Sequence, residues 1–119
     1  MAWEYNQGSG VLTYNGNFVW VGYSGARMAV NDPAFERDPF QGPIPRGRYR
    51  IRLHASAGRA PPVFKLTPEG HNAFGRTDFL IHGDNQRQNF TASEGCIILP
   101  VNIRNLVLQY KDDLLEVIP

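Results

Sequence analysis

The only cysteine of the chain, Cys96, follows His82 by fourteen residues, and these two side chains together could do covalent chemistry. A cysteine attacks as its thiolate, so it needs a lowered pKa or a neighbouring base, which an imidazole can supply. His82 ends the short apolar run 79–82, and Cys96 begins the run 96–99. If the two runs form neighbouring strands, the loop between them can bring the thiol and the imidazole into contact. The spacing therefore indicates a cysteine nucleophile with a histidine base.

The residues directly before Cys96 suit a turn that presents a nucleophile. Gly95 has no Cβ, so the backbone can turn sharply and direct its amide groups at a substrate carbonyl. Such amides would form an oxyanion hole that stabilises the charge of a tetrahedral intermediate. Ser93 could shape the same turn or hydrogen-bond the substrate. A lone cysteine is more often a buried, inert core residue, but the histidine, the turn and the apolar run that follows favour catalysis.

Other polar residues could complete a substrate site around this pair. Asp84 and Asn85 follow the histidine and could hold the loop or contact a substrate amine, although both residue types are common in turns. Tyr23 and Ser24 could line a cleft, although packing and turn formation are the more common roles. The candidate oxyanion and substrate-binding residues are Ser93, Glu94, Gly95, Gly83, Asp84, Tyr23 and Ser24.

The composition describes a small globular protein. A chain of 119 residues can bury one core without disulfides or metals, so we expect a single domain over residues 1–119. Twelve Lys and Arg against eleven Asp and Glu give a net charge of +1, without the basic footprint of a nucleic-acid binder. A single cysteine excludes an intrachain disulfide. The N-terminus lacks the pattern of a secretory signal, and no apolar run approaches the roughly 18 residues of a membrane span.

Twelve glycines and nine prolines divide the chain into short pieces, which is typical of β structure with many turns. Asn15 and Gly16 suit a tight hairpin turn between strands at 11–14 and 18–22. The proline-rich segment 31–47 is expected to be a long surface loop, since proline removes backbone donors. Further strands are expected at 48–53, 63–66, 78–82, 96–99 and 114–118.

The strand at 48–53 alternates apolar and basic residues, which predicts one buried and one wet face. Tyr49, Ile51 and Leu53 would be buried. The three arginines between them would be solvated charges, with contacts to substrate carboxylates as the less favoured interpretation.

A short amphipathic helix is expected near the C-terminus. Apolar residues of this segment recur at the spacing of one helix face: Ile103, Leu106, Val107 and Tyr110. Asn102 is a candidate cap. The sum of these elements is a mainly β fold, a compact sandwich or barrel-like sheet, with one short peripheral helix.

Four segments, in order along the chain, carry a resemblance to a known family: GYSG (22–25), GPIPRGRY (42–49), LTPEGHNAFGRTDFLIHGDN (66–85) and SEGCIILP (93–100). His82 followed by Ser93-Glu94-Gly95-Cys96 is similar to the His and Ser/Thr-x-Gly-Cys signature of L,D-transpeptidase (YkuD-type) catalytic domains. The four segments together resemble more closely the L,D-transpeptidase-like peptidoglycan effectors of bacterial type VI secretion systems.

This resemblance implies a compact L,D-transpeptidase-like β fold in which Cys96 is the nucleophile and His82 the general base, oriented by a backbone carbonyl. The implied reaction is attack on the third residue of a peptidoglycan tetrapeptide stem, which expels the terminal D-alanine and leaves a thioester. Water as acceptor would give L,D-carboxypeptidase activity, a free D-amino acid would give exchange, and a stem amine would give a cross-link. No metal and no cofactor are expected.

The resemblance also implies partners and a place of action. Gly83, Glu94 and Ile98 stand where housekeeping enzymes often have a hydroxyl residue, a histidine and an arginine, which favours the effector branch. An effector made in the cytoplasm without a signal peptide would be exported by a type VI secretion apparatus. It would act as an antibacterial toxin in the target-cell periplasm, and a cognate immunity protein would inhibit it.

Other functions stay open on the sequence alone. A zinc site would use the ligand types of His54, His71, His82 and Cys96, but their spacings match no common zinc pattern. A non-catalytic wall-binding or partner-binding module of the same fold would leave the thiol packed in the core. Exposed aromatic residues would suit glycan stacking in such a module, and the candidates are Trp3, Tyr5, Trp20 and Tyr23. Serine hydrolase chemistry is disfavoured, since TASEG lacks the first glycine of a G-x-S-x-G turn.

Overall fold

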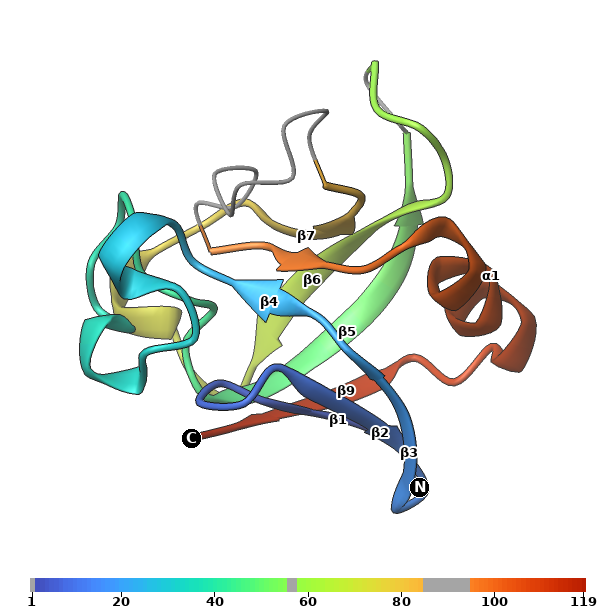
Figure 1. Ribbon diagram of the computed structural model, residues 1–119, viewed down its shortest axis with the longest axis horizontal. Helices are drawn as coiled ribbons and strands as arrows, with labels where there is room; N and C mark the ends of the chain where they lie inside the picture. Colours follow the sequence, from blue (N-terminus) through green and yellow to red (C-terminus); the bar gives the residue numbers. More distant parts are fainter. Residues whose placement is uncertain (1, 56–57, 85–94) are drawn as a thin grey trace.

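A single curved sheet accounts for most of the fold (Figure 1). The computed structural model describes residues 2–55, 58–84 and 95–119. Within these ranges the chain forms nine strands and one α-helix, with short 3-10 turns between them. The elements are β1 (Trp3–Asn6), β2 (Val11–Tyr14), β3 (Asn17–Val21), β4 (Tyr23–Ser24), β5 (Gly47–His54), β6 (Val63–Glu69), β7 (Phe79–His82), β8 (Ile97–Ile98), α1 (Val101–Tyr110) and β9 (Leu114–Ile118), with 3-10 turns at Arg27–Ala29, Pro33–Phe35 and Ala73–Gly75.

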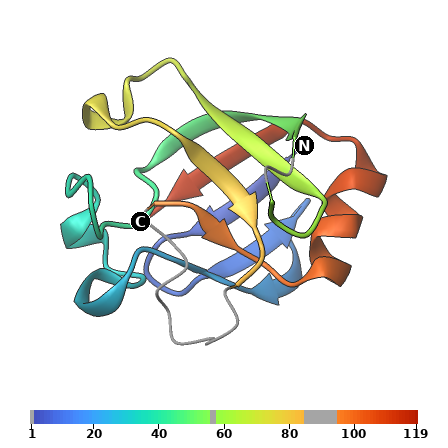
Figure 2. The same ribbon diagram turned by 90° about the horizontal axis from the view of Figure 1, so that it is seen from above.

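The sheet curves so strongly that it nearly closes into a barrel (Figures 1 and 2). The strand order is β3-β2-β1-β9-β5-β6-β7-β8-β4. The two end strands, β3 and β4, are consecutive in the chain and are separated only by Gly22, so one continuous segment forms both edges of the sheet. The inner face carries the main core, which includes Trp3, Tyr5, Tyr49, Phe79 and Leu115. The prediction of a mainly β, barrel-like fold with one short peripheral helix is confirmed.

The predicted hairpin at Asn15 and Gly16 is confirmed. β2 and β3 pair antiparallel, with Leu12 opposite Trp20. Both turn residues have positive φ, 51° at Asn15 and 83° at Gly16, as a tight hairpin turn requires. The strands expected at 78–82 and 114–118 are present as β7 and β9.

Strand β5 buries fewer residues than its alternation predicts. Tyr49 and Ile51 are buried in the core, but Leu53 is 64% exposed. The neighbouring strand β9 pairs with β5 only from Gly47 to Arg50, so the end of β5 that carries Leu53 extends beyond the core. The expectation that Leu53 is buried is therefore wrong.

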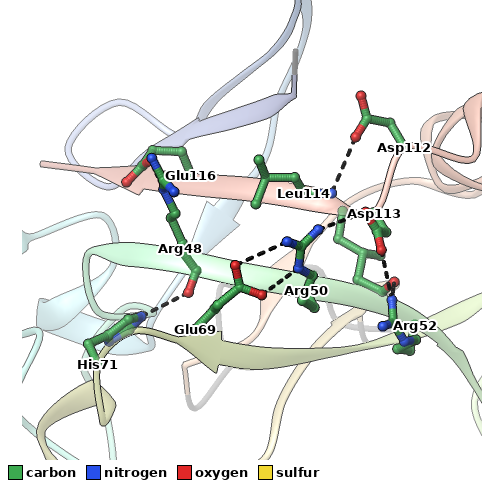
Figure 3. Close-up of polar contacts among 10 residues, drawn as sticks. Arg48, Arg50, Arg52, Glu69, His71, Asp112, Asp113, Leu114 and Glu116 are labelled. Atoms are coloured by element: carbon green, nitrogen blue, oxygen red, sulfur yellow. Dashed lines mark hydrogen bonds and ion pairs between the residues drawn. The ribbon is translucent and has the colours of Figure 1, made fainter.

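The arginines of β5 form ion pairs on the outer face of the sheet (Figure 3). Arg50 donates to the carboxylates of Glu69 and Asp113, and Asp113 also accepts from Arg52 at 3.0 Å. Arg48 pairs with a glutamate of β9 at 3.4 Å. The arginines are partly exposed, as expected for solvated charges, but their partners are carboxylates of the protein itself. Exposed pairs of this kind contribute little to stability individually.

The proline-rich segment 31–47 is more buried than expected. Ile44 is fully buried, and Glu36 is only 7% exposed. The Glu36 carboxylate accepts hydrogen bonds from the side-chain amide of Gln7 and from the backbone N–H of Arg46, both at 3.0 Å. Gln7 also donates to the carbonyl of Ile44 at 2.9 Å. The expectation of a surface loop is therefore wrong for the part around Glu36 and Ile44. The polar groups of this part are buried without a neighbouring strand, because side chains form hydrogen bonds with them.

Helix α1 begins directly after Pro100 and packs beside the barrel. Ile103 and Val107 join the main core, as predicted. Asn102 lies inside the first turn, so the prediction that it caps the helix is wrong. Pro100 occupies the cap position, because the helix begins two residues earlier than a cap at Asn102 would place it. No helix in the described ranges is long and apolar enough to cross a membrane.

Candidate functional site

Strands β7 and β8 are parallel neighbours at the upper side of the barrel in Figure 1. Ile81 pairs with Ile97, and His82 pairs with Ile98. The backbone N–H of Leu99 donates to the carbonyl of His82 at 3.1 Å, which continues the pairing past the end of β8. The inference that the two apolar runs form neighbouring strands is confirmed.

Alternation divides the side chains of these strands between two faces. The inner-face residues belong to the main core: Phe79, Ile81, Ile97 and Leu99. A second, smaller cluster contains Cys96 and Ile98, together with Tyr23 from the adjacent β4. Leu80 packs against this outer cluster, and His82 follows Leu80 on the same face by alternation. The register therefore places the thiol and the imidazole on one face of adjacent strands.

Cys96 lies directly before β8 and is 8% exposed. Its Sγ lies 3.8 Å from the carbonyl oxygen of Asp78, to which the thiol is a weak donor. The preceding Gly95 has a φ of +111°, which residues with a side chain rarely adopt. A Cβ at this position would lie 2.5 Å from Nη2 of Arg76. Backbone conformation and space both require glycine here, in agreement with the predicted sharp turn, and the oxyanion role of Gly95 stays a prediction.

His82 is 4% exposed, and a single hydrogen bond fixes the tautomer of its neutral ring. Nδ1 lies 2.7 Å from the carbonyl oxygen of Gly83. A carbonyl oxygen can only accept, so Nδ1 carries the ring proton and Nε2 carries the free electron pair. Nε2 is buried and has no hydrogen-bond partner among the described residues. The nitrogen that can accept a proton therefore makes no hydrogen bond to the part of the chain that the structure describes.

The pKa of His82 lies below its ordinary value of 6.5. Burial is the largest cause, because it disfavours the charged ring, and the positive charges of Arg59 and Arg104 add to it. The hydrogen bond to Gly83 and the charge of Asp84 act in the opposite direction. The neutral imidazole, which is the form that can act as a base, is therefore favoured at neutral pH.

Arg104 of α1 is buried behind the turn that follows His82. Its guanidinium donates to the carbonyl of Leu99 at 3.0 Å and to two carbonyls of the segment 60–62 at 2.8 and 2.9 Å. A Cβ at Gly83 would lie 2.8 Å from Nη2 of this arginine. The absence of a side chain at Gly83, a predicted substrate contact, thus lets the helix side chain approach the candidate base closely.

Two buried arginines beside the site, Arg76 and Arg104, were not predicted from the sequence. They are 6% and 3% exposed. Burial lowers the pKa of both guanidinium groups, although arginine stays charged in proteins. A sequence signal existed for Arg104, a charge between the buried positions Ile103 and Val107 of the helix. Arg76 lies in a turn-rich segment without periodicity, so no pattern marked it as buried.

Tyr23 and Asp84 connect β4 to the turn after β7. The buried Tyr23 donates its hydroxyl proton to Oδ1 of Asp84 at 2.7 Å. Both residues therefore lie beside the candidate pair, and their role in substrate binding stays a prediction. Ser24 differs, because it is fully buried and its hydroxyl accepts a hydrogen bond from the backbone N–H of Ile44 at 2.8 Å. This hydrogen bond ties β4 to the segment 31–47 and gives Ser24 a structural role.

The remaining predicted residues lie elsewhere. Ser93, Glu94 and Asn85 lie outside the described residues. His54 is exposed at the end of β5, and His71 is hydrogen-bonded to two backbone groups, at 2.9 and 3.1 Å. In the part of the chain that the structure describes, no three His, Cys, Asp or Glu side chains come together to hold a metal ion.

The family model of the Tlde1 domain matches residues 19–114, a range that begins in β3, ends in β9 and includes both His82 and Cys96. A search of curated proteins finds no match.

A Gly95→Ala substitution tests whether this turn tolerates a side chain. We expect it to lower the free energy of unfolding by about 3 kcal/mol, because backbone strain adds to the overlap with the Arg76 guanidinium. Gly70→Ala is the matched control, since Gly70 also has positive φ (+81°) but nothing within 4 Å of a new Cβ. Strain alone should cost the control about 1 kcal/mol in urea unfolding. Equal losses for the two variants would contradict the packing described here.

Proposed function

Because the chain belongs to the Tlde1 domain family of type VI secretion L,D-transpeptidase effectors, we propose that it is a cysteine-dependent enzyme that modifies peptidoglycan tetrapeptide stems. One observation supports this proposal above the others. By strand alternation, His82 lies on the same face as Cys96, and its Nε2 has no hydrogen-bond partner among the described residues. A base and a nucleophile on neighbouring strands are the minimum that acyl transfer requires.

In the proposed reaction, Nε2 of His82 accepts the thiol proton of Cys96, and Sγ attacks the carbonyl carbon of the third stem residue. The tetrahedral intermediate then collapses. The peptide C–N bond breaks, the imidazolium returns its proton to the leaving nitrogen, and D-alanine departs as the free amino acid. The product on the enzyme is a thioester between Sγ and the shortened stem.

The acceptor of the acyl group decides the activity. Attack by water regenerates the thiol and releases a tripeptide stem, which is L,D-carboxypeptidase activity. Attack by the amine of a free D-amino acid restores a tetrapeptide with an exchanged fourth residue. Both reactions consume the tetrapeptide donors that a target cell needs for L,D-cross-links. We propose that these small acceptors are preferred over the amine of a second stem.

The turn at Gly95 is the proposed site of oxyanion stabilisation. Its positive φ departs from the extended conformation of a strand. The backbone N–H groups around the nucleophile are therefore not constrained to point at a neighbouring strand. In a partly buried site, amides directed at the developing oxyanion would lower the barrier more than they would in water. Tyr23 and Asp84, which are hydrogen-bonded to each other beside the thiol, are the proposed substrate contacts on the side of β4.

The family gives the biological setting of this proposal. A type VI secretion effector is delivered into another cell by the secretion apparatus. We propose that this chain acts in the periplasm of the target bacterium as an antibacterial toxin. A cognate immunity protein that blocks the site would protect the producing cells.

A non-catalytic binding module of the same fold is the alternative, and the burial of its expected aromatic residues disfavours it. Trp3, Tyr5 and Tyr23 are each at most 6% exposed, so they are not available for stacking on a glycan. Trp20 is 42% exposed. Trp20 is therefore the one of these four candidates whose ring is exposed.

Product analysis on purified muropeptides tests the proposed reaction. Incubation with tetrapeptide muropeptides, with and without a free D-amino acid, should give tripeptides and exchanged tetrapeptides that mass spectrometry can identify. Cys96→Ala should give no product, and His82→Ala should reduce the rate by about 10²–10⁴-fold, the usual contribution of a general base. Unchanged muropeptides with the folded wild-type protein would favour the binding module. Abundant cross-linked dimers without the other two products would contradict the proposed acceptor preference.

The pH dependence of kcat/KM tests the role of His82 in the free enzyme. Its lowered pKa means that the ring stays neutral to lower pH than an ordinary histidine, so the acid limb should have its midpoint below 6.5. His54→Gln is the control, because His54 is exposed and distant in sequence from the site, and it should leave the profile unchanged. A midpoint of the acid limb clearly above 6.5 would show that the burial of His82 does not set the pKa of the catalytic base.

A further inference from the structure

Arg76 is held in the interior by backbone carbonyls of a single loop. Nη1 donates to the carbonyls of Glu36 at 2.6 Å and Pro43 at 2.7 Å, and Nη2 donates to the carbonyl of Gly42 at 3.0 Å. The three acceptors are backbone carbonyls, and these bonds fix the position of the guanidinium. They also connect the segment that leads into β7 to the buried part of the segment 31–47.

The same guanidinium packs under the turn that carries the candidate nucleophile. Its Nη2 lies 2.5 Å from the position that a Cβ on Gly95 would occupy, so the group fills the space that this glycine leaves. Its Cζ lies 5.5 Å from the ring centroid of Phe79, at the start of β7. Arg76 therefore touches the backbone immediately before Cys96 from inside the protein.

The position of this charge is unusual for a structural arginine. Arg76 is 6% exposed, and burial of a cation is costly unless a nearby negative charge compensates. Burial lowers the pKa of Arg76, whereas the negative forms of four neighbours raise it. These neighbours are Tyr49, Asp38, Cys96 and Glu36. The thiolate of Cys96 is thus one of the negative charges that interact with the guanidinium.

We propose that Arg76 is a positioning residue that holds the turn at Gly95 and, through its buried positive charge, favours the thiolate form of Cys96. This inference rests on the proposed role of Cys96 as nucleophile. It adds a second source of activation to the imidazole: His82 removes the proton, and the guanidinium stabilises the anion that remains. Arg76 acts through the backbone and the electric field, and it transfers no proton itself.

Other titratable residues lie on the elements around the thiol. They are His82 of β7, Tyr23 of β4, Asp84 after β7 and Asp78 before it. A carboxylate near a thiol opposes the formation of a thiolate, and a protonated imidazole favours it. A test of Arg76 must therefore change this residue alone and leave the others in place.

The rate of alkylation of the single thiol as a function of pH is the direct test. Iodoacetamide labels the thiolate, and the chain has one cysteine, so intact-protein mass reports one site. We expect a wild-type midpoint below the ordinary cysteine value of about 8.5. Arg76→Gln should move the midpoint up by about one pH unit or more, whereas Arg76→Lys, which keeps the charge, should retain most of the wild-type value. Arg48→Gln removes an exposed, ion-paired charge of β5 and should leave the midpoint unchanged.

Urea unfolding of each variant separates the charge from the fold. A merely structural role predicts that Arg76→Gln and Arg76→Lys lose stability without a difference in midpoint between them, and this outcome would overturn the proposal. If Arg76→Gln does not fold, the alkylation midpoints of Arg76→Lys and the wild type test the proposal. A wild-type midpoint at or above about 8.5, or a large shift in folded Arg76→Lys, would then overturn it.

Failure of this inference is distinguishable from failure of the proposed function, because alkylation requires no substrate. One outcome is the expected shift of the alkylation midpoint in Arg76→Gln without any turnover of muropeptides by the wild type. This outcome would support the role of Arg76 and contradict the proposed peptidoglycan reaction. Equal kcat/KM and equal midpoints for the wild type and Arg76→Gln would overturn the role of Arg76 and leave the reaction intact.

Discussion

The parallel pairing of β7 with β8 is the constraint on which the candidate site depends. Because side chains alternate along a strand, a shift of one residue in β8 would turn Cys96 into the core and expose Ile97. The register is held on the inner side by Ile81 and Ile97, which pack in the main core, and at the strand end by the hydrogen bond from Leu99 to the carbonyl of His82. The apolar core therefore sets the position of the polar pair on its outer face.

A buried arginine supports each of the two sides of this site. A buried arginine binds backbone carbonyls and occupies the space that a glycine leaves, with Arg76 under Gly95 and Arg104 behind Gly83. Each arginine ties a distant element to the site, one the segment 31–47 and the other the helix α1. The carbonyls offset part of the cost of burying each charge. The charges also bear on the chemistry, since a cation beside the imidazole favours its neutral form and a cation beside the thiol favours the thiolate.

Local patterns made part of this structure predictable. The Asn15-Gly16 turn, the helix face and the runs at 79–82 and 114–118 each carry their information within a few residues. The pairing of His82 with the strand after Cys96 was also inferable, because both ends of the loop lie at strand edges. These features need only short-range geometry and the chemistry of two side chains.

The rest depends on contacts between residues far apart in sequence. β1 exists because it pairs in parallel with β9 at the other end of the chain, and β4 exists because it pairs with β8. Neither segment shows a pattern strong enough to predict a strand alone. The exposure of Leu53 follows from where β9 begins, since its first residue, Leu114, pairs with Arg50. The burial of Glu36 follows from the hydrogen bonds that it accepts from Gln7 and Arg46. No periodicity in the sequence records such partners.

The most direct test of the central claim, that Cys96 is an acylated nucleophile, is to trap the thioester. Wild-type protein would be mixed with tetrapeptide muropeptide, quenched in acid within the first turnover, digested and analysed by mass spectrometry. The account predicts a mass increase equal to the muropeptide minus D-alanine on the peptide that contains Cys96, lost on treatment with hydroxylamine and absent from Cys96→Ala. Release of D-alanine by Cys96→Ala at the rate of the wild type would contradict it.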